Sequence, residues 1–141
     1  MRRSLKLNLV SLIVLVGGLS VGASTLQTDS SIDTYWVKFK AAVIKRDQEA
    51  IAAMVQFPIT MSYGIQPIRT RSQLLKRSRD LFNRQTDAAK CFAEAKPEPD
   101  PSSRSKFSVA CKDAAGNEVV IYGFVRSKGG WKLKSLDNIN E

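Results

Sequence analysis

The sequence contains no histidine, and this absence excludes several kinds of active site. Its 141 residues include two cysteines, Cys91 and Cys111. The usual serine or cysteine nucleophile needs an imidazole base, which this chain cannot supply. Two thiolates without histidine cannot complete a tetrahedral zinc shell. We therefore expect no metal site.

Phosphate-binding loops and catalytic carboxylate pairs are missing as well. Gly17-Gly18 lies in the N-terminal apolar stretch, and Gly129-Gly130 is typical of a turn. Most carboxylates fall near the ends of predicted helices or strands, where water keeps them ionised, and Asp47 is placed to cap a helix. No carboxylate stands out as a buried general base. The sequence predicts no cofactor and favours a non-enzymatic role.

The N-terminus has the three parts of a secretory signal peptide. A basic segment, 1–6, precedes the apolar stretch 7–19 and the small residues 21–23. The apolar stretch is short for a membrane span. We expect cleavage after Ala23, export to the periplasm or the cell exterior, and no membrane span afterwards. The alternative to cleavage is an uncleaved N-terminal anchor. The pair Arg2-Arg3 is compatible with a twin-arginine signal as well as with an ordinary basic segment.

The expected mature chain is basic. Cleavage removes three of the 22 Lys and Arg and none of the 13 Asp and Glu, which leaves 19 against 13, or +6. Such a charge favours anionic neighbours such as lipids, polysaccharides or nucleic acid. Export argues against nucleic acid.

Cys91 and Cys111 are expected to form a disulfide, because an even cysteine count in an exported chain is typical of a bridge. Closing a loop of about twenty residues stabilises a fold by roughly 3 kcal/mol on the chain-entropy estimate. The alternative is two buried thiols on neighbouring strands.

Three helices are predicted after a polar, flexible lead-in at 24–31. They span Ile32–Lys45, Gln48–Gln56 and Arg71–Asn83. Each has apolar residues at helical spacing, and the first has the strongest pattern. Asp47 and a capping box before the third helix mark two of the helix starts.

Strands are predicted mainly in the last third of the chain, separated by glycine-containing turn signals. Together with the helices they predict one α+β domain over residues 32–141, following the signal peptide at 1–23. A Pro-rich exposed loop, 96–103, connects two of the strands. The predicted strands and short extended segments are Ile59–Met61 and Ile65–Ile68 (a small hairpin or bent edge), Asp87–Ala95, Phe107–Lys112, Val119–Arg126 and Trp131–Leu136.

The combined motifs resemble small exported bacterial proteins of the nuclear transport factor 2-like superfamily, with a cystatin-like fold. The resemblance implies three N-terminal helices packed on the concave face of a curved, mainly antiparallel sheet, with a cavity between them. It also implies a homodimer through the open sheet face, and no catalytic residue can be carried over. The motifs are Trp36-x-x-Phe39-x-x-Ala42-Val43, Asp47-x-x-Ala50-Ile51, Phe57-Pro58, Leu81-Phe82 and Tyr122-Gly-Phe124 followed by Gly129-Gly-Trp-Lys-Leu133.

Large aromatic residues are the candidates to line such a cavity and bind a small apolar ligand, with simple core packing as the alternative. A tunnel ending at a buried carboxylate would favour an enzyme. A cavity closed by Phe39, Phe82 and Trp131 would favour a structural or partner-binding role. The candidates are Tyr35, Trp36, Phe39, Phe57, Tyr63, Phe82, Tyr122 and Phe124.

Basic residues of the third helix are a separate candidate, for binding anions. They are Arg71, Lys76, Arg77 and Arg79. A solvated helix face is the simpler explanation, and a docking site for an anionic envelope polymer or lipid headgroup is the functional one. Three functions therefore stay open: an exported non-enzymatic domain for a small apolar ligand or a partner protein, an isomerase- or dehydratase-like enzyme, and a basic adaptor for envelope polyanions.

Overall fold

The computed structural model describes residues 26–62, 64–84, 86–112 and 115–138. The predicted signal peptide lies outside these residues. Within them, no helix is both long and apolar enough to cross a bilayer. In chain order the elements are α1 (Leu26–Lys45), α2 (Gln48–Ala53), β1 (Val55–Met61), α3 (Arg71–Phe82), α4 (Ala88–Glu94), β2 (Glu98–Pro99), β3 (Lys106–Lys112), β4 (Glu118–Ser127) and β5 (Gly130–Asn138).

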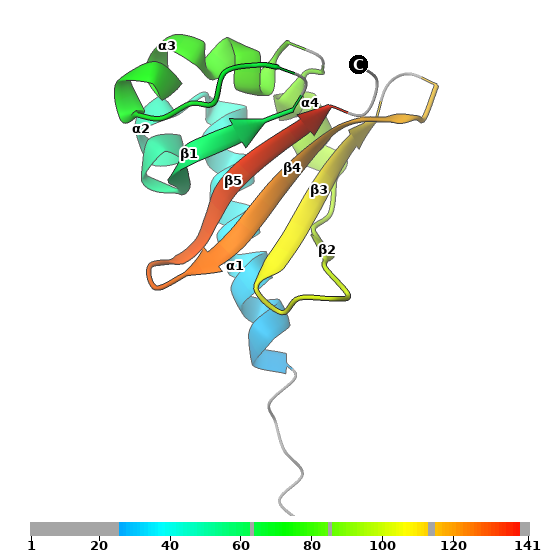
Figure 1. The fold of residues 1–141 in the computed structure, drawn as a ribbon. Coiled ribbons are helices and arrows are strands. Elements are labelled where there is room, and N and C mark those ends of the chain that lie inside the picture. The colour runs from blue at the N-terminus through cyan, green and yellow to red at the C-terminus, as the bar shows by residue number, and fades with distance from the viewer. Residues whose placement is uncertain (1–25, 63, 85, 113–114, 139–141) are drawn as a thin grey trace, which may run out of the picture.

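The strands form one curved, mixed sheet in the order β1-β5-β4-β3-β2. β3, β4 and β5 pair antiparallel, so the three C-terminal strands predicted from the sequence are confirmed. β1 lies parallel to β5, with Val55 opposite Leu133. Figure 1 shows that the sheet is twisted and open, with β1 and the short β2 at its two edges.

The helices cover one face of this sheet, as predicted. In Figure 1, α1 and α4 lie behind the strands, and α2 and α3 lie beside β1. Side chains of β4 alternate accordingly: Tyr122 and Phe124 are buried, whereas Gly123 and Val125 are half-buried on the other face. The predicted α+β architecture is therefore confirmed, with the helices on the concave face.

The segment Asp87–Ala95 contains a helix, α4, and the prediction of a strand there was wrong. The Asp87 carboxylate accepts a hydrogen bond from the Lys90 backbone N–H at 3.2 Å and caps the helix. Ala88 and Phe92, one turn apart, are both buried on the same side. Because of α4, the described chain has four helices where three were predicted.

Two other boundaries differ from the prediction. α1 begins at Leu26, inside the segment expected to be a flexible lead-in. α2 ends at Ala53, three residues before the predicted end at Gln56, because the chain turns there to join the sheet. The Met54 carbonyl accepts a hydrogen bond from the Leu133 N–H at 3.0 Å, which pairs the start of β1 with β5.

β1 is longer than the predicted Ile59–Met61 segment and contains the cis Phe57-Pro58 peptide. Proline lacks a backbone N–H, so it fits an edge strand such as this one. Ile59 and Ile68 exchange two backbone hydrogen bonds of 2.7 and 3.0 Å. The bent edge predicted around these isoleucines is therefore present, with the rest of β1 added on its N-terminal side.

Candidate functional site

Most of the predicted cavity-lining aromatic residues pack against one another between the helices and the sheet. The ring centroids of Phe39 and Phe124 are 5.2 Å apart, and those of Trp36 and Phe124 are 6.1 Å apart. Phe107 stacks on Phe124 at 4.5 Å and meets Trp131 edge-on at 5.0 Å. The first helix thus packs directly on the C-terminal strands.

Phe92 of α4 adds a ring that sequence reasoning did not place in this core. Its centroid lies 4.9 Å from those of Trp36 and Tyr122, and Phe82 stacks on Tyr122 at 6.0 Å. Beside Phe82 and Tyr122 a cavity of about 10 Å³ is left, which is close to the volume that one water requires. Aromatic rings therefore fill the space in which an apolar ligand was expected.

The remaining candidates lie closer to the surface or outside the described residues. Tyr35 and Phe57 are half-buried, and Tyr63 is not described. The Tyr35 hydroxyl donates a hydrogen bond to the Met54 carbonyl at 2.9 Å. Burial raises the pKa of Tyr35 well above its ordinary value near 10, and a backbone hydrogen bond from Leu133 offsets this in part. Tyr35 is therefore neutral at physiological pH and bonded to the backbone.

Tyr122 is likewise bonded within the fold. Its side chain is 1% exposed, and its hydroxyl donates to the Leu81 carbonyl at 2.9 Å, near the end of α3. Burial raises the pKa of Tyr122 far above the ordinary tyrosine value, while the Thr86 hydroxyl lowers it in part. This hydroxyl satisfies a helix-end carbonyl and does not face an open cavity.

Every acidic side chain whose exposure the structure describes, from Asp33 to Asp137, is at least partly exposed. Asp47 accepts a hydrogen bond from the Ala50 N–H at 3.0 Å and caps α2, as Asp87 caps α4. Asp80 forms an ion pair with Arg77 at 3.1 Å. The same ranges contain no group of three or more potential metal ligands. Asp47, Asp80 and Asp87 therefore have structural roles in capping and ion pairing.

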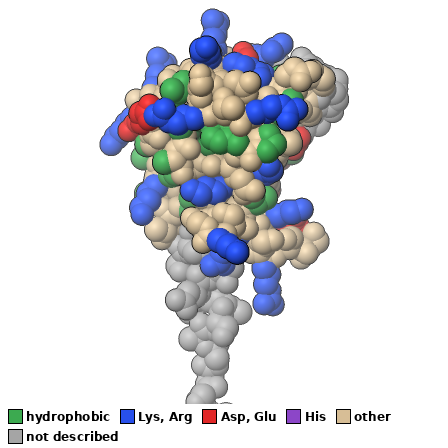
Figure 2. Space-filling model, turned by 60° about the vertical axis from the view of Figure 1, so that its left-hand side comes forward, with side chains coloured by type: hydrophobic (Ala, Val, Ile, Leu, Met, Phe, Trp, Pro, Cys, Tyr) green, Lys and Arg blue, Asp and Glu red, His purple; other side chains and the backbone are tan. Residues whose placement is uncertain are grey.

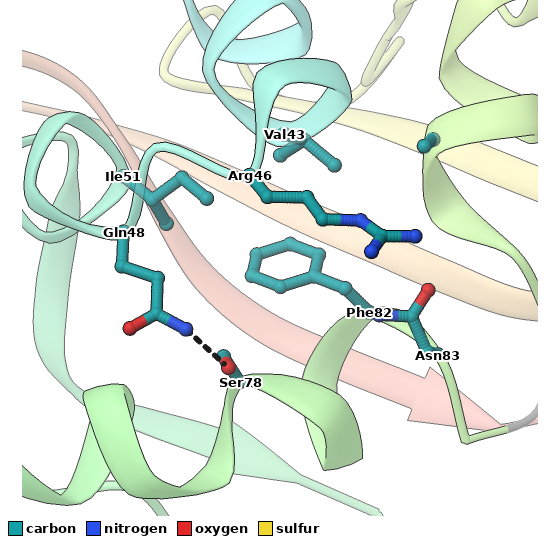
Figure 3. Close-up of a pocket in the computed structure, with 8 residues that line it drawn as sticks. Val43, Arg46, Gln48, Ile51, Ser78, Phe82 and Asn83 are labelled. Atoms are coloured by element: carbon teal, nitrogen blue, oxygen red, sulfur yellow. Dashed lines mark hydrogen bonds between the residues drawn. The ribbon is translucent and has the colours of Figure 1, made fainter.

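A small pocket opens among the four helices, with a volume of about 80 Å³. Its floor is apolar and its rim is polar. Figure 3 shows the Phe82 ring on the floor and the Arg46 side chain extended across the opening toward Asn83. The lining residues are Val43, Arg46, Gln48, Ile51, Ser78, Phe82, Asn83 and Ala89.

One hydrogen bond connects two elements across this pocket. The Gln48 side-chain amide donates to the Ser78 hydroxyl at 3.0 Å, which joins α2 to α3 (Figure 3). Arg46 and Asn83 lie farther along the rim and leave their polar groups facing the opening. Sequence reasoning missed this pocket, apart from Phe82, because its residues come from four separate segments.

Two of the four basic residues predicted on α3 form ion pairs, and the other two extend into solvent. Arg71 pairs with Glu49 of α2. Arg77 pairs with Asp80 and donates to the Gln66 carbonyl at 2.8 Å. Lys76 and Arg79 are exposed.

Two lysines of β5 add positive charge at the end of α2 and at β1. The Lys132 ammonium donates to the Ala53 carbonyl at 2.7 Å, and the Lys134 ammonium donates to the Pro58 carbonyl at 2.7 Å. They thus lie against the end of α2 and against β1. We call the six cations Arg71, Lys76, Arg77, Arg79, Lys132 and Lys134 the basic edge. Figure 2 shows Lys and Arg spread over this side of the molecule, with few Asp and Glu among them.

The predicted disulfide is present. Cys91 of α4 and Cys111 of β3 are bonded, with their Cα atoms 5.7 Å apart. The alternative of two thiols on neighbouring strands is excluded, since Cys91 lies on a helix. The bridge fastens α4 to the sheet, and so positions Phe92 in the aromatic core.

The sheet face that points away from the helices carries an open groove of about 480 Å³. Ile121 and Val125 of β4 contribute apolar surface, and Pro99 and Pro101 border it on one side. A homodimer through this face stays a prediction.

Comparison with known proteins finds solved structures that are similar to this chain at low sequence identity. A de novo designed protein with a curved β-sheet aligns with a TM-score of 0.48 and 14% identity, over 77% of this chain and 96% of its own. The type 2 hexachlorocyclohexane dehydrochlorinase LinA aligns with a TM-score of 0.47 and 14% identity, over 82% of this chain and 87% of its own. An NTF2-like protein with a cystatin-like fold from Novosphingobium aromaticivorans aligns with a TM-score of 0.44 and 13% identity, over 80% of this chain and 81% of its own. No family model and no curated protein matches the sequence.

Proposed function

We propose that this chain, a domain of nuclear transport factor 2-like fold, is an exported, non-enzymatic binding protein whose basic edge docks on an anionic polymer of the cell envelope. The carrying observation is the concentration of charge around α2, β1 and α3. Four cations lie on α3, and two lysines of β5 reach the carbonyls of Ala53 and Pro58, which precede it in the chain. Two acidic side chains, Glu49 and Asp80, pair with members of the group. An anionic polymer complements such a surface at several points at once.

The filled interior supports a surface function over a ligand cavity. Phe39 and Phe82 are 0% and 5% exposed, and Trp131 is 5% exposed, as expected for a cone that is closed by its own side chains. Drug-sized pockets measure roughly 300–1,000 Å³, far above the cavity beside Tyr122. The enzyme alternative draws no support from Asp47 and Asp87, which cap helices, or from Glu49 and Asp80, which pair with arginine.

Export is supported by two features of the chain. The N-terminal segment has the pattern of a signal peptide, and the Cys91–Cys111 bridge suits an oxidising compartment. Mass spectrometry of the protein recovered from its host tests this proposal. We expect a chain that begins at Ser24 and lacks two hydrogens at the bridge.

Binding to the polymer is tested with a charge-reversal pair on α3. Lys76→Glu with Arg79→Glu changes the net charge by −4 at two exposed positions of α3. The control, Lys96→Glu with Lys112→Glu, makes the same charge change at exposed positions next to α4 and β3. We measure the affinity for dextran sulfate over a range of NaCl concentrations.

We expect the α3 pair to weaken binding roughly 30- to 1,000-fold at low salt. The two lost cations account for about 2 kcal/mol, and repulsion by the two introduced carboxylates adds up to about 2 kcal/mol more. The control should bind nearly as tightly as the wild type, and added salt should weaken all binding. Equal losses in the two variants would show that net charge alone drives binding, which contradicts a defined basic edge. Salt-insensitive binding would contradict it too.

A further inference from the structure

We infer that the pocket among the four helices is a binding site for a small carboxylate, with Arg46 as its ionic partner. This site shares none of the six cations of the basic edge, although α3 contributes residues to both. The inference depends on the backbone at Arg46, on the chemistry of the rim and on the size of the pocket.

The backbone at Arg46 has a conformation that favours glycine. Arg46 has φ 56°, directly after the end of α1. Its N–H bonds to the Val43 carbonyl at 3.0 Å, and the Asp47 N–H bonds to the Ala42 carbonyl at 2.9 Å. These two bonds define a Schellman motif, in which the left-handed residue is usually glycine. Arginine is disfavoured there by sterics, so the fold accepts a cost at this position that glycine would avoid.

The Arg46 side chain reaches over the pocket, as Figure 3 shows. Its guanidinium presents several N–H donors in one plane, which match the two oxygens of a carboxylate. The adjacent Asp47 carboxylate already accepts the Ala50 N–H. On the rim, the Asn83 amide adds a further donor beside the guanidinium. The opening is therefore lined by donors suited to one anionic group.

The apolar floor and the volume of the pocket limit the polarity and the size of the ligand beyond its carboxylate. Val43, Ile51 and Phe82 give an apolar floor, which favours a short aliphatic stem beneath the charged group. A volume of about 80 Å³ admits a ligand of only a few heavy atoms. One guanidinium balances a monoanion, so a carboxylate on a short carbon chain fits this site better than a phosphate dianion. Such a group exists on short-chain acids and at the C-terminus of a peptide.

Titration followed by NMR tests the inference on the purified protein. Propionate is the probe, propionamide is its neutral analogue, and the signals of the Arg46 Nε–H and the Asn83 side-chain amide are followed. We expect saturable shifts with propionate and none with propionamide. A second arm compares a short peptide ending in alanine, with either a free or an amidated C-terminus. If the free-acid peptide binds more tightly than propionate, the carboxylate comes from a peptide C-terminus. If propionate binds more tightly, it comes from a short-chain acid.

Arg46→Gly is the decisive variant, because glycine suits the left-handed backbone and the fold should be kept. Losing a charge-assisted contact should weaken propionate binding roughly 10- to 100-fold. The control, Lys45→Gln, removes one positive charge from the exposed neighbouring residue outside the pocket and should bind like the wild type. Shifts that do not saturate, that propionamide reproduces, or that persist at Asn83 in Arg46→Gly would overturn the inference.

Discussion

Removing the Cys91–Cys111 bridge should destabilise the domain strongly while leaving its architecture intact. The bridge joins α4 to β3 across 20 residues of sequence. α4 is short, and it presents Phe92 to the rings of Trp36 and Tyr122. Without the bridge, the unfolded chain gains freedom and the folded chain keeps its aromatic contacts.

The magnitude follows from the loop length and from the burial of Cys111. Loop closure over 20 residues corresponds to an entropy of about 11 cal/mol/K, or about 3 kcal/mol at room temperature. Cys111 is 0% exposed, so its replacement by alanine deletes a buried sulfur and costs about 1 kcal/mol more in packing. The Cys91→Ala/Cys111→Ala variant should therefore lose about 4 kcal/mol of unfolding free energy.

Urea denaturation followed by circular dichroism measures this loss. With a slope of about 1.5 kcal/mol/M for a domain of this size, the midpoint should fall by roughly 2–3 M. Cys91→Ala alone, kept reduced, breaks the bridge but retains the buried sulfur of Cys111, so it should lose only the loop term of about 3 kcal/mol. A loss below about 1 kcal/mol in this single variant would refute the loop-closure reasoning.

Three further predictions concern the core and the sheet. Phe39→Ala should lower the unfolding free energy by about 3–5 kcal/mol in urea, and a loss typical of a surface site would contradict the filled interior. The raised pKa values of Tyr35 and Tyr122 stabilise the fold fully below pH about 10, and above it each should lose up to about 1.4 kcal/mol per pH unit. Thermal melts at rising pH should show this, and Tyr35→Phe/Tyr122→Phe should remove the added sensitivity. Gly123→Ala places a methyl group against the Ser135 hydroxyl and should cost about 1–3 kcal/mol, which Ser135→Ala should largely restore.

Sequence reasoning succeeded where the deciding interactions are local. The glycine turn at Gly129-Gly130 and the apolar runs beside it specify an antiparallel hairpin, and β4 and β5 pair there as predicted. Likewise Thr70 caps α3 by accepting the Gln73 N–H at 3.2 Å, so the start of that helix was predicted correctly.

The errors arise where local signals compete or where partners are distant in sequence. Around Cys91 and Phe92, a short apolar segment fits either a strand or a helix, and the cap from Asp87 decides for the helix. The parallel pairing of β1 with β5 depends on contacts about 75 residues apart, as between Thr60 and Ser135. Neither the sequence period nor a turn signal encodes such a pairing.

The two candidate sites also differ in how far the sequence predicts them. The charges of α3 are visible in the sequence, but Lys132 and Lys134 bond to the Ala53 and Pro58 carbonyls only because β1 pairs with β5. The Arg46 pocket has no sequence signature, since the residue looks like an ordinary cation at the end of a helix. Its distinguishing feature is the left-handed backbone, which becomes evident only in the fold.

Because the aromatic rings of this cone pack against one another, both proposed binding sites lie outside the aromatic core. The two proposed surfaces share the pair of helices α2 and α3, joined by the Gln48–Ser78 hydrogen bond, yet they depend on different cations. Arg46→Gly should therefore leave dextran sulfate binding close to that of the wild type, and Lys76→Glu/Arg79→Glu should leave the response to propionate in place. Because each variant is a control for the other site, failure of one proposal does not remove the other. Loss of both activities in either variant would instead show that α2 and α3 form a single binding surface.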